Sequence, residues 1–349
     1  MRCSNISAWR CWFGFCRGFK PGGISTLSLQ RLNSAGYNSP ILQIHHLAAA
    51  FPIYIRLGSR SIHPHLFFES LAYVIAFTTY LYLRRHFGDP VALPLRWATV
   101  AAAVAGAALG SKLLYWLEDP RATLQNVQNS TYLIGGKTIV GALIGGLITV
   151  EVMKRYIGLR TSTGDLYAIP LAIGIAVGRI GCFLTGLSDN TYGTRTTLPW
   201  GVNFGDGIHR HPTQLYEIIF LLVLIPMLYH CLKRIISRQS VMGSAASAKQ
   251  SGADAESKDP YYRGGSGVQE VFPALDDRRL APGFLPGDAF KLFMVSYMSF
   301  RILADFIKPY PRLFLGLGGI QWACTMILLY YSRAVRRSLS TPAKQTLKG

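Results

Sequence analysis

Apolar runs long enough to cross a bilayer constrain this chain more than any other feature. A helix rises about 1.5 Å per residue, so about 20 apolar residues span a ~30 Å hydrocarbon core, and seven runs meet or nearly meet that length. Half of the residues are hydrophobic and 15% are charged, which is typical of membrane proteins. The sequence predicts an all-α polytopic membrane protein with seven transmembrane helices. The runs are Leu66–Leu83, Arg96–Leu117, Tyr132–Met153, Leu166–Leu187, Gln214–Ile235, Asp288–Ile307 and Leu313–Tyr331.

The distribution of basic residues predicts the orientation. Lys and Arg number 36 against 17 Asp and Glu, but they cluster at the ends of runs rather than on one polar face, which argues against nucleic-acid binding. Such clusters mark cytoplasmic ends. We therefore expect the N-terminus outside and the C-terminus inside. The clusters follow the first, third, fifth and seventh runs, at Arg84 and Arg85, at Lys154, Arg155 and Arg160, at Lys233, Arg234 and Arg238, and at Arg333, Arg336 and Arg337.

The segments around the runs divide the chain into expected parts. The first part is rich in Ser, Gly and basic residues, and is expected to be disordered or to lie upstream of a mis-assigned start. The stretch between helices four and five mixes Thr, Trp and Val with Gly and Pro, which predicts a small extracytoplasmic cap with a hairpin. The parts are a basic tail (1–45), membrane helices one to five (46–235) with the cap (188–212), a flexible cytoplasmic linker (236–283), helices six and seven (284–332) and a basic cytoplasmic tail (333–349).

Two arginines lie inside predicted spans. Arg179 is about 12 Å and Arg301 about 9 Å from the outer end of its run, so the two share a depth. A charge at the centre of a membrane helix costs roughly 2.5 to 3.5 kcal/mol, so each arginine needs an anionic partner. Asp305, four residues after Arg301, could be a structural counter-ion. The interpretation we favour is a lipid phosphate, because guanidinium groups bind phosphate oxygens in a bidentate manner.

Other polar residues also lie toward the outer ends of the runs, which predicts one polar cavity facing the outer leaflet. Lysines near a helix end often extend to the interface, and histidines there are more often anchors than catalysts, so a structural interpretation stays open for each. These residues are His63, His65, Lys112, Lys137, Arg210, His211 and Glu217.

The cysteines have no repeated spacing, so neither a disulfide framework nor a zinc site is indicated. We expect free thiols and no metal or cofactor. The six cysteines are Cys3, Cys11, Cys16, Cys182, Cys231 and Cys324.

Three motifs together resemble a known family, the bacterial prolipoprotein diacylglyceryl transferases. The resemblance covers about Phe51–Tyr331, and it is specific because the first two motifs occur in one chain. The motifs are GRIGCF with a following YG (178–183 and 192–193), RHPTQLYE (210–217) and FRILADF (300–306).

The resemblance implies an activity and a set of partners. The family has seven transmembrane helices with the N-terminus outside, in agreement with the charge distribution. The implied reaction moves the diacylglyceryl group of phosphatidylglycerol to the lipobox cysteine thiol of a prolipoprotein and releases glycerol phosphate, in the inner membrane of a bacterium. The implied partners are phosphatidylglycerol, lipobox-containing prolipoprotein precursors and membrane lipids, without nucleic acid. The implied catalytic residues are Arg179 and Arg301, which also bind the phosphate, and the motif histidine His211. Substrate binding is implied for Tyr216, Glu217 and Gly193.

The chain departs from the family pattern at four places. Val140 stands where the family usually has the histidine that is often proposed as base, and Cys182 replaces an asparagine. The acidic residue expected after it is replaced by the longer LSDNTYG. His65 stands about where the family has a functional tyrosine, and a histidine can accept a proton near neutrality, so His65 is a candidate base. Cys182 is interpreted as inert packing, with a covalent carrier as the alternative.

Two other functions remain open. One is a paralogous transferase that binds the same lipid headgroup and modifies another acceptor. The other is a non-enzymatic seven-helix transporter or receptor. The last run lacks the lysine that a retinal pump needs, and the sequence shows no inverted repeat typical of a carrier.

Overall fold

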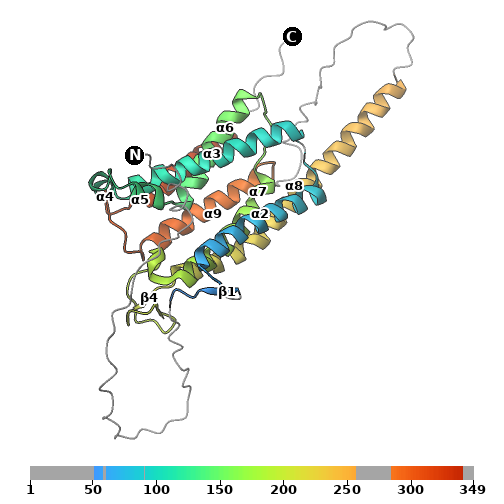
Figure 1. Ribbon diagram of the computed structural model, residues 1–349. Helices are drawn as coiled ribbons and strands as arrows, with labels where there is room; N and C mark the ends of the chain where they lie inside the picture. Colours follow the sequence, from blue (N-terminus) through green and yellow to red (C-terminus); the bar gives the residue numbers. More distant parts are fainter. Residues whose placement is uncertain (1–50, 58–59, 90, 257–283, 341–349) are drawn as a thin grey trace, which may run out of the picture.

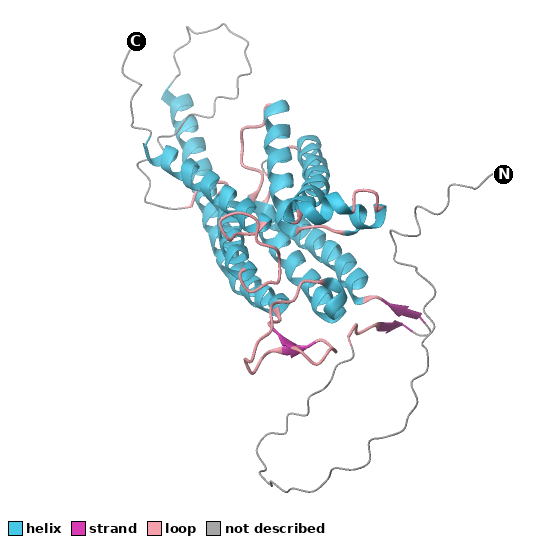
Figure 2. Cartoon of the chain, turned by 90° about the vertical axis from the view of Figure 1, so that its left-hand side faces the viewer, coloured by secondary structure: helices cyan, strands magenta, loops and turns pink. Residues whose placement is uncertain are grey.

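The computed structural model describes residues 51–57, 60–89, 91–256 and 284–340, without the side chains of 241–256 and 334–340. Helices dominate the described residues and form a bundle, with the short strands at one end (Figures 1 and 2). The expected tail at 1–45 lies outside these residues, as do parts of the expected linker and of the C-terminal tail. The elements are β1 (Ile55–Leu57), β2 (Arg60–Ile62), α2 (Pro64–Phe87), α3 (Leu93–Glu118), α4 (Pro120–Gln125), α5 (Ser130–Gly135), α6 (Ile139–Tyr156), α7 (Asp165–Thr185), η1 (Gly186–Asp189), β3 (Val202–Asn203), β4 (His209–Arg210), α8 (Thr213–Glu256), α9 (Asp288–Asp305) and α10 (Gly319–Ser340).

Four described helices are long and apolar enough to cross a membrane. They are Pro64–Phe87, Leu93–Glu118, Asp165–Asp189, which joins α7 and η1, and Thr213–Ser240 within α8. The remaining predicted runs correspond to α6, α9 and α10, which are shorter or carry more charge. A helical membrane protein is thus confirmed, whereas the number of seven spans and the orientation stay predictions.

Two predicted runs differ in detail from the observed helices. The third is divided into α5 and α6, because Gly136 and Lys137 leave the helix and Thr138 caps α6 by accepting a hydrogen bond from the Gly141 amide at 3.2 Å. The seventh begins at Gly319 rather than at Leu313. A tight turn precedes it, with positive φ at Leu315 and Gly316.

The segment expected to be a linker also differs in part. Helix α8 continues to Glu256, well beyond the predicted end of its run at Ile235. Alanine and lysine, which favour helix, occur in this extension. The remainder of 236–283 lies outside the described residues.

The hairpin predicted for the cap is confirmed. Strands β3 and β4 pair antiparallel, with Val202 opposite Arg210 and Asn203 opposite His209. A further bridge joins Arg195 to Arg210. The cap leads directly into α8, so it holds the start of that helix.

Helices α7 and α9 run in parallel from a shared end. The Asp165 carboxylate, at the start of α7, accepts hydrogen bonds from the backbone amides of Gly287 and Ala289, at 2.5 and 3.1 Å, and so caps α9. At about 1.5 Å per residue, Arg179 and Arg301 each lie roughly 20 Å along their helices from this end. The shared starting point therefore brings the two arginines to one level.

Helices α3 and α6 pack closely through glycines. A Cβ atom added at Gly145 would collide with the Gly106 carbonyl oxygen, and one added at Gly141 would collide with that of Gly110. Small residues at these positions let two membrane helices approach each other. Close packing of the two helices therefore accounts for these glycines.

We predict that Gly145→Ala lowers the free energy of unfolding by about 1 to 3 kcal/mol, because the added methyl group overpacks the interface of α3 and α6. The matched control is Gly135→Ala, since no atom lies within 4 Å of the position of its Cβ. Unfolding by SDS in mixed detergent micelles measures both. Equal stability of the two variants would contradict this packing.

Candidate functional site

A buried carboxylate joins the two intramembrane arginines. Glu217, in the first turns of α8, places Oε2 2.9 Å from Arg179 Nε and 3.3 Å from Arg301 Nη1. The Tyr297 hydroxyl donates a 2.6 Å hydrogen bond to the other carboxylate oxygen. Glu217, Arg179 and Arg301 are 2%, 6% and 3% exposed. The two arginines, 122 positions apart in the sequence, thus share one counter-ion.

The buried arginines retain hydrogen-bonding capacity beyond Glu217. Among the described residues, neither Arg179 Nε nor Arg301 Nε has a hydrogen-bond partner, because the Arg179 ion pair lies outside hydrogen-bonding geometry. Asp305, the counter-ion considered from the sequence, reaches Arg301 Nη2 only at 3.7 Å. A buried donor without a partner is costly, so this centre favours an additional anion.

A third cation lies beside the arginines. Lys308 follows α9 and is 3% exposed, with its Nζ 5.4 Å from the centre of the Tyr310 ring. Burial, together with the nearby charges of Arg301 and Arg179, lowers the pKa of Lys308 to about 7. Three basic groups therefore lie near three carboxyl groups, those of Glu217, Asp305 and Glu118.

A second polar group adjoins Arg179. His65, in the first turn of α2, places Nδ1 2.9 Å from Asp189 Oδ1 and 4.0 Å from Cys182 Sγ. Arg179 Nη1 lies 3.8 Å from the same sulfur atom. Cys182 is therefore in contact with both His65 and one of the two arginines.

The motif histidine lies in a different network. His211 Nδ1 is 3.1 Å from the Tyr216 hydroxyl, to which Trp200 Nε1 donates at 2.9 Å. The Gly193 amide donates to the His211 carbonyl oxygen at 2.8 Å. A Cβ atom at Gly193 would lie 2.6 Å from His211 Cβ and 2.9 Å from the Ile307 carbonyl oxygen. Glycine is therefore needed where the cap meets the end of α9, and the contacts of His211 and Tyr216 described here do not include Glu217 or the arginines.

The remaining polar residues near the helix ends mostly have structural partners. Lys112 Nζ donates to the carbonyl oxygens of Ile134 and, at 2.5 Å, Gly136. Lys137 Nζ pairs with Glu69, which also lies 3.5 Å from His65 Nε2. The predicted cavity toward the outer leaflet stays a prediction.

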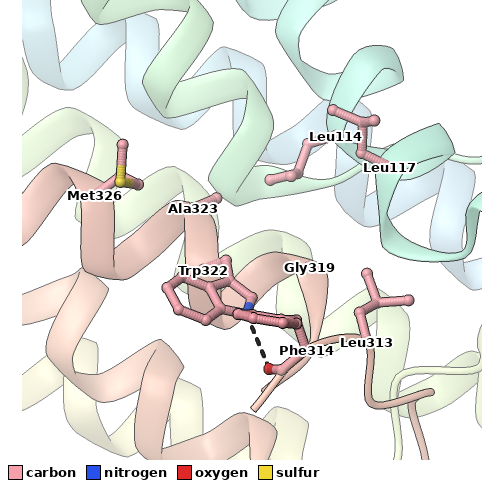
Figure 3. Close-up of a pocket in the computed structure, with 8 residues that line it drawn as sticks. All are labelled: Leu114, Leu117, Leu313, Phe314, Gly319, Trp322, Ala323 and Met326. Atoms are coloured by element: carbon pink, nitrogen blue, oxygen red, sulfur yellow. Dashed lines mark hydrogen bonds between the residues drawn. The ribbon is translucent and has the colours of Figure 1, made fainter. Parts of the chain in front are cut away.

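A pocket of about 550 Å³ lies between α3 and the start of α10. In Figure 3, Leu117 approaches it from one side and Trp322 from the other, with the Trp322 Nε1 atom donating to the Phe314 carbonyl oxygen at 3.1 Å. Its lining is apolar and includes neither arginine. The pocket is formed by Leu114, Leu117, Leu313, Phe314, Gly319, Trp322, Ala323 and Met326.

Several residues of this region were not singled out from the sequence. Lys308 lies in a connecting segment and Asp189 at the end of the short helix η1. A charge at such a position is ordinarily solvated and gives no signal in the sequence. Tyr297 and Gln214 lie in helices, and their contacts with other elements cannot be read from the local sequence. Glu69 offered the clearest signal, because it is an acid in the second turn of a predicted span. The residues are Glu69, Asp189, Gln214, Tyr297 and Lys308.

The fold and the site define a class: a helical membrane protein with a buried centre of two arginines and a glutamate at the end of the bundle that carries the strands. Residues 52–248, more than half of the chain, match the family model described as prolipoprotein diacylglyceryl transferase. The chain belongs to this family. The matched range includes Arg179 and Glu217 but ends before α9, so Arg301 is linked to it through the contact with Glu217.

Curated relatives agree with the family. The chain is similar to proteins named phosphatidylglycerol–prolipoprotein diacylglyceryl transferase from Clostridium tetani (39% identical over 126 residues, 34% of this chain and 49% of the relative) and from a Wolbachia of Brugia malayi (34% over 181 residues, 48% and 65%). A protein of the same name from Coxiella burnetii is 29% identical over 185 residues, 50% of this chain and 67% of the relative. The matches thus cover about half to two thirds of the length of these relatives.

We predict that Glu217→Gln lowers the free energy of unfolding by about 3 to 5 kcal/mol, because it leaves two buried guanidinium groups without their shared counter-ion. The control is Glu151→Gln, which removes a pair with Lys154 whose glutamate side chain is 43% exposed, and should change the same quantity by less than about 1 kcal/mol. SDS unfolding of both variants in micelles provides the comparison. A loss no larger than that of the control would show that Glu217 is not the common partner.

Proposed function

We propose that this chain transfers the diacylglyceryl group of phosphatidylglycerol to the lipobox cysteine thiol of prolipoproteins. The observation that carries the proposal is the pair of buried arginines that meet at Glu217 and whose Nε atoms make no hydrogen bond with the described residues. Membership of the family and the names of the relatives support it.

Arg179 and Arg301 are the proposed phosphate ligands. Guanidinium groups remain charged and form paired hydrogen bonds with phosphate oxygens. In the absence of lipid, Glu217 balances part of their charge and keeps both side chains at one level. Lys308 adds a third positive group when it is protonated, and so strengthens the field that an incoming phosphate meets.

The reaction needs a thiolate and a stabilised leaving group. The acceptor sulfur forms a bond to the glyceryl carbon, the bond between this carbon and the phosphate oxygen breaks, and its electron pair leaves on glycerol phosphate. The arginines stabilise the charge that develops on the phosphate oxygen. We assign activation of the acceptor thiol to the group of His65, Cys182 and Asp189, which touches Arg179 through Cys182.

The residues of the cap have a separate proposed role. His211, Tyr216 and Gly193 connect the β3–β4 segment to the start of α8 and the end of α9. By holding these helix ends together, they keep Glu217 and Arg301 in register, and His211 is a positioning residue rather than the base.

The proposed arrangement in the membrane follows the sequence. Seven helices cross the inner membrane of a bacterium, with the strands and the arginine centre toward the outside and the start of α9 toward the cytoplasm. The basic clusters in the last turns of α2 and α6, and the cluster after the first part of α8, support this orientation. Phosphatidylglycerol and prolipoproteins would then reach the site from the outer leaflet.

The experiment that tests the proposal uses the full chain in nanodiscs and a lipobox peptide. With phosphatidylglycerol present, mass spectrometry should detect a diacylglyceryl adduct on the peptide cysteine, together with glycerol phosphate. Phosphatidylcholine of the same acyl composition and a peptide with serine in place of the cysteine are the controls. Absence of the adduct from folded protein with phosphatidylglycerol would overturn the proposed function.

We predict that Arg179→Lys and Arg301→Lys each reduce transfer by about 100-fold or more, because an ammonium group cannot reproduce the paired contacts of guanidinium at a developing charge. The matched control is Arg96→Lys. Arg96 is also buried and paired, with Asp89, but lies where α3 begins, at the opposite end of the bundle. The transfer rate per folded protein should fall for the Arg179 and Arg301 variants and not for the Arg96 variant. Retained transfer in either of the first two would show that this arginine is not a phosphate ligand.

A further inference from the structure

Three possible metal ligands converge beside Arg179. His65 comes from α2, Cys182 from the last turn of α7 and Asp189 from η1. One donor atom from each lies within 4.8 Å of the other two. The spacing of the cysteines gave no indication of this group, because His65 and Cys182 are 117 positions apart.

The geometry points to a divalent metal site, with zinc as the ion that fits best, held by His65 Nδ1, Cys182 Sγ and a carboxylate oxygen of Asp189. The inference deepens the proposed function and rests on it, since the metal would activate the acceptor thiol. It also revises the expectation, from sequence spacing, that the chain holds no metal.

Distances between the donor atoms fit a common centre. Ligands about 2.0 to 2.3 Å from zinc in tetrahedral geometry are separated from one another by roughly 3.3 to 3.8 Å. The observed separations from His65 Nδ1 are 2.9 Å to Asp189 Oδ1 and 4.0 Å to Cys182 Sγ, on either side of that range. Small side-chain adjustments would therefore bring the donor atoms to the distances expected around one zinc ion.

A simple hydrogen-bonded pair explains the arrangement less well. An imidazole Nδ1 atom carries at most one proton and can donate it to one acceptor. Here a carboxylate oxygen and a sulfur atom both face the same Nδ1, which suits three ligands around one ion better than a chain of hydrogen bonds. The set of thiolate, imidazole and carboxylate is also typical of zinc rather than of magnesium or calcium.

Outer contacts orient two of the ligands. The Thr191 hydroxyl donates a 2.5 Å hydrogen bond to Asp189 Oδ2, and Gln214 Nε2 donates in turn to Thr191 at 3.1 Å. His65 Nε2 lies 3.5 Å from a Glu69 carboxylate oxygen. A carboxylate at the outer nitrogen of a ligating histidine is a recurrent feature of zinc sites, because it fixes the ring and raises its basicity.

Three protein ligands leave one tetrahedral position for a substrate, as in catalytic zinc sites. The His65 side chain is 31% exposed, whereas that of Asp189 is 8% exposed, so an acceptor would approach past His65. Cys182 thiolate and the Asp189 carboxylate neutralise the charge of the ion, and the Arg179 guanidinium lies 3.8 Å from the sulfur atom. The activated thiol would thus be close to the phosphate that Arg179 binds.

Transfer of the diacylglyceryl group to the zinc-bound acceptor thiol needs no further reactant. A thiol bound to zinc loses its proton outright, in this case to water at the exposed side of His65. The resulting sulfur atom forms the bond to the glyceryl carbon, and the electron pair of the broken carbon–oxygen bond leaves on glycerol phosphate.

Cobalt(II) tests the site, because a thiolate ligand gives it a charge-transfer band in the near ultraviolet. The full chain, purified without a histidine tag, stripped with a chelator and returned to nanodiscs, should bind about one Co²⁺ with tetrahedral visible bands. Cys182→Ala should abolish the charge-transfer band. His65→Ala and Asp189→Asn should weaken binding at least about tenfold, and Glu69→Gln should weaken it about 10- to 100-fold while the band persists.

Matched cysteine variants serve as controls. Cys231→Ala and Cys324→Ala remove buried free thiols elsewhere in the bundle and should keep the band, as should the combined replacement of Cys3, Cys11 and Cys16 by alanine. A wild-type protein without the band, or a band that survives Cys182→Ala, would overturn the site. Transfer to the peptide by metal-free protein would overturn the inference and leave the proposed function standing. A bound metal without any transfer from phosphatidylglycerol would support the site and remove the function.

Discussion

The shared ion pair of Glu217 with Arg179 and Arg301 joins three helices of the bundle, α7, α8 and α9. Two guanidinium groups within one apolar bundle repel each other, and each requires a counter-charge. One carboxylate from α8 supplies it for α7 and α9 together. At the far end, the Asp165 carboxylate caps the N-terminus of α9 and so sets the height of α9 relative to α7. At the near end, the segment 188–212 places the start of α8 between these two helices. The helices are therefore fixed at both ends around a charged centre that apolar packing alone could not specify.

Periodicity and charge predicted much of this fold. Run length gave the helices α2, α3, α7 and α9 to within a few residues, because apolar side chains in a bilayer must cover a fixed thickness. The helix rise also placed Arg179 and Arg301 at one level. The division between α5 and α6 was missed because Gly136 and Lys137 interrupt a run that remains apolar on average. The late start of α10 was missed because Leu313, Phe314 and Leu315 read as apolar span although they form a turn.

The partners of the site residues were harder to predict than the residues themselves. Asp305 was considered as the counter-ion because it is one helical turn from Arg301, yet Glu217, from another helix, is closer to that arginine. Contacts between helices have no signature in the local sequence. The same reason applies to Asp189, which no periodic pattern could bring to His65. The family resemblance named Glu217 and both arginines, but the contact between them comes from the structure.

Three of the four departures from the family pattern lie close together. His65, Cys182 and Asp189 are neighbours, and the first two replace residues of different chemistry in the motifs. Val140, where the family's histidine is expected, is instead 1% exposed within the hydrophobic core. The chain thus lacks the polar residue at position 140 and has a polar group at His65, Cys182 and Asp189 instead. This exchange is consistent with a chain that keeps the phosphate centre and activates the acceptor thiol by different means.

Binding of a lipid phosphate by the two arginines can be seen directly in an electron cryomicroscopy structure of the full chain in nanodiscs containing phosphatidylglycerol. We expect a lipid whose phosphate contacts the guanidinium groups of both Arg179 and Arg301, with its glyceryl carbon facing His65 and Cys182. A lipid phosphate bound elsewhere, with both arginines still closed on Glu217, would contradict this expectation.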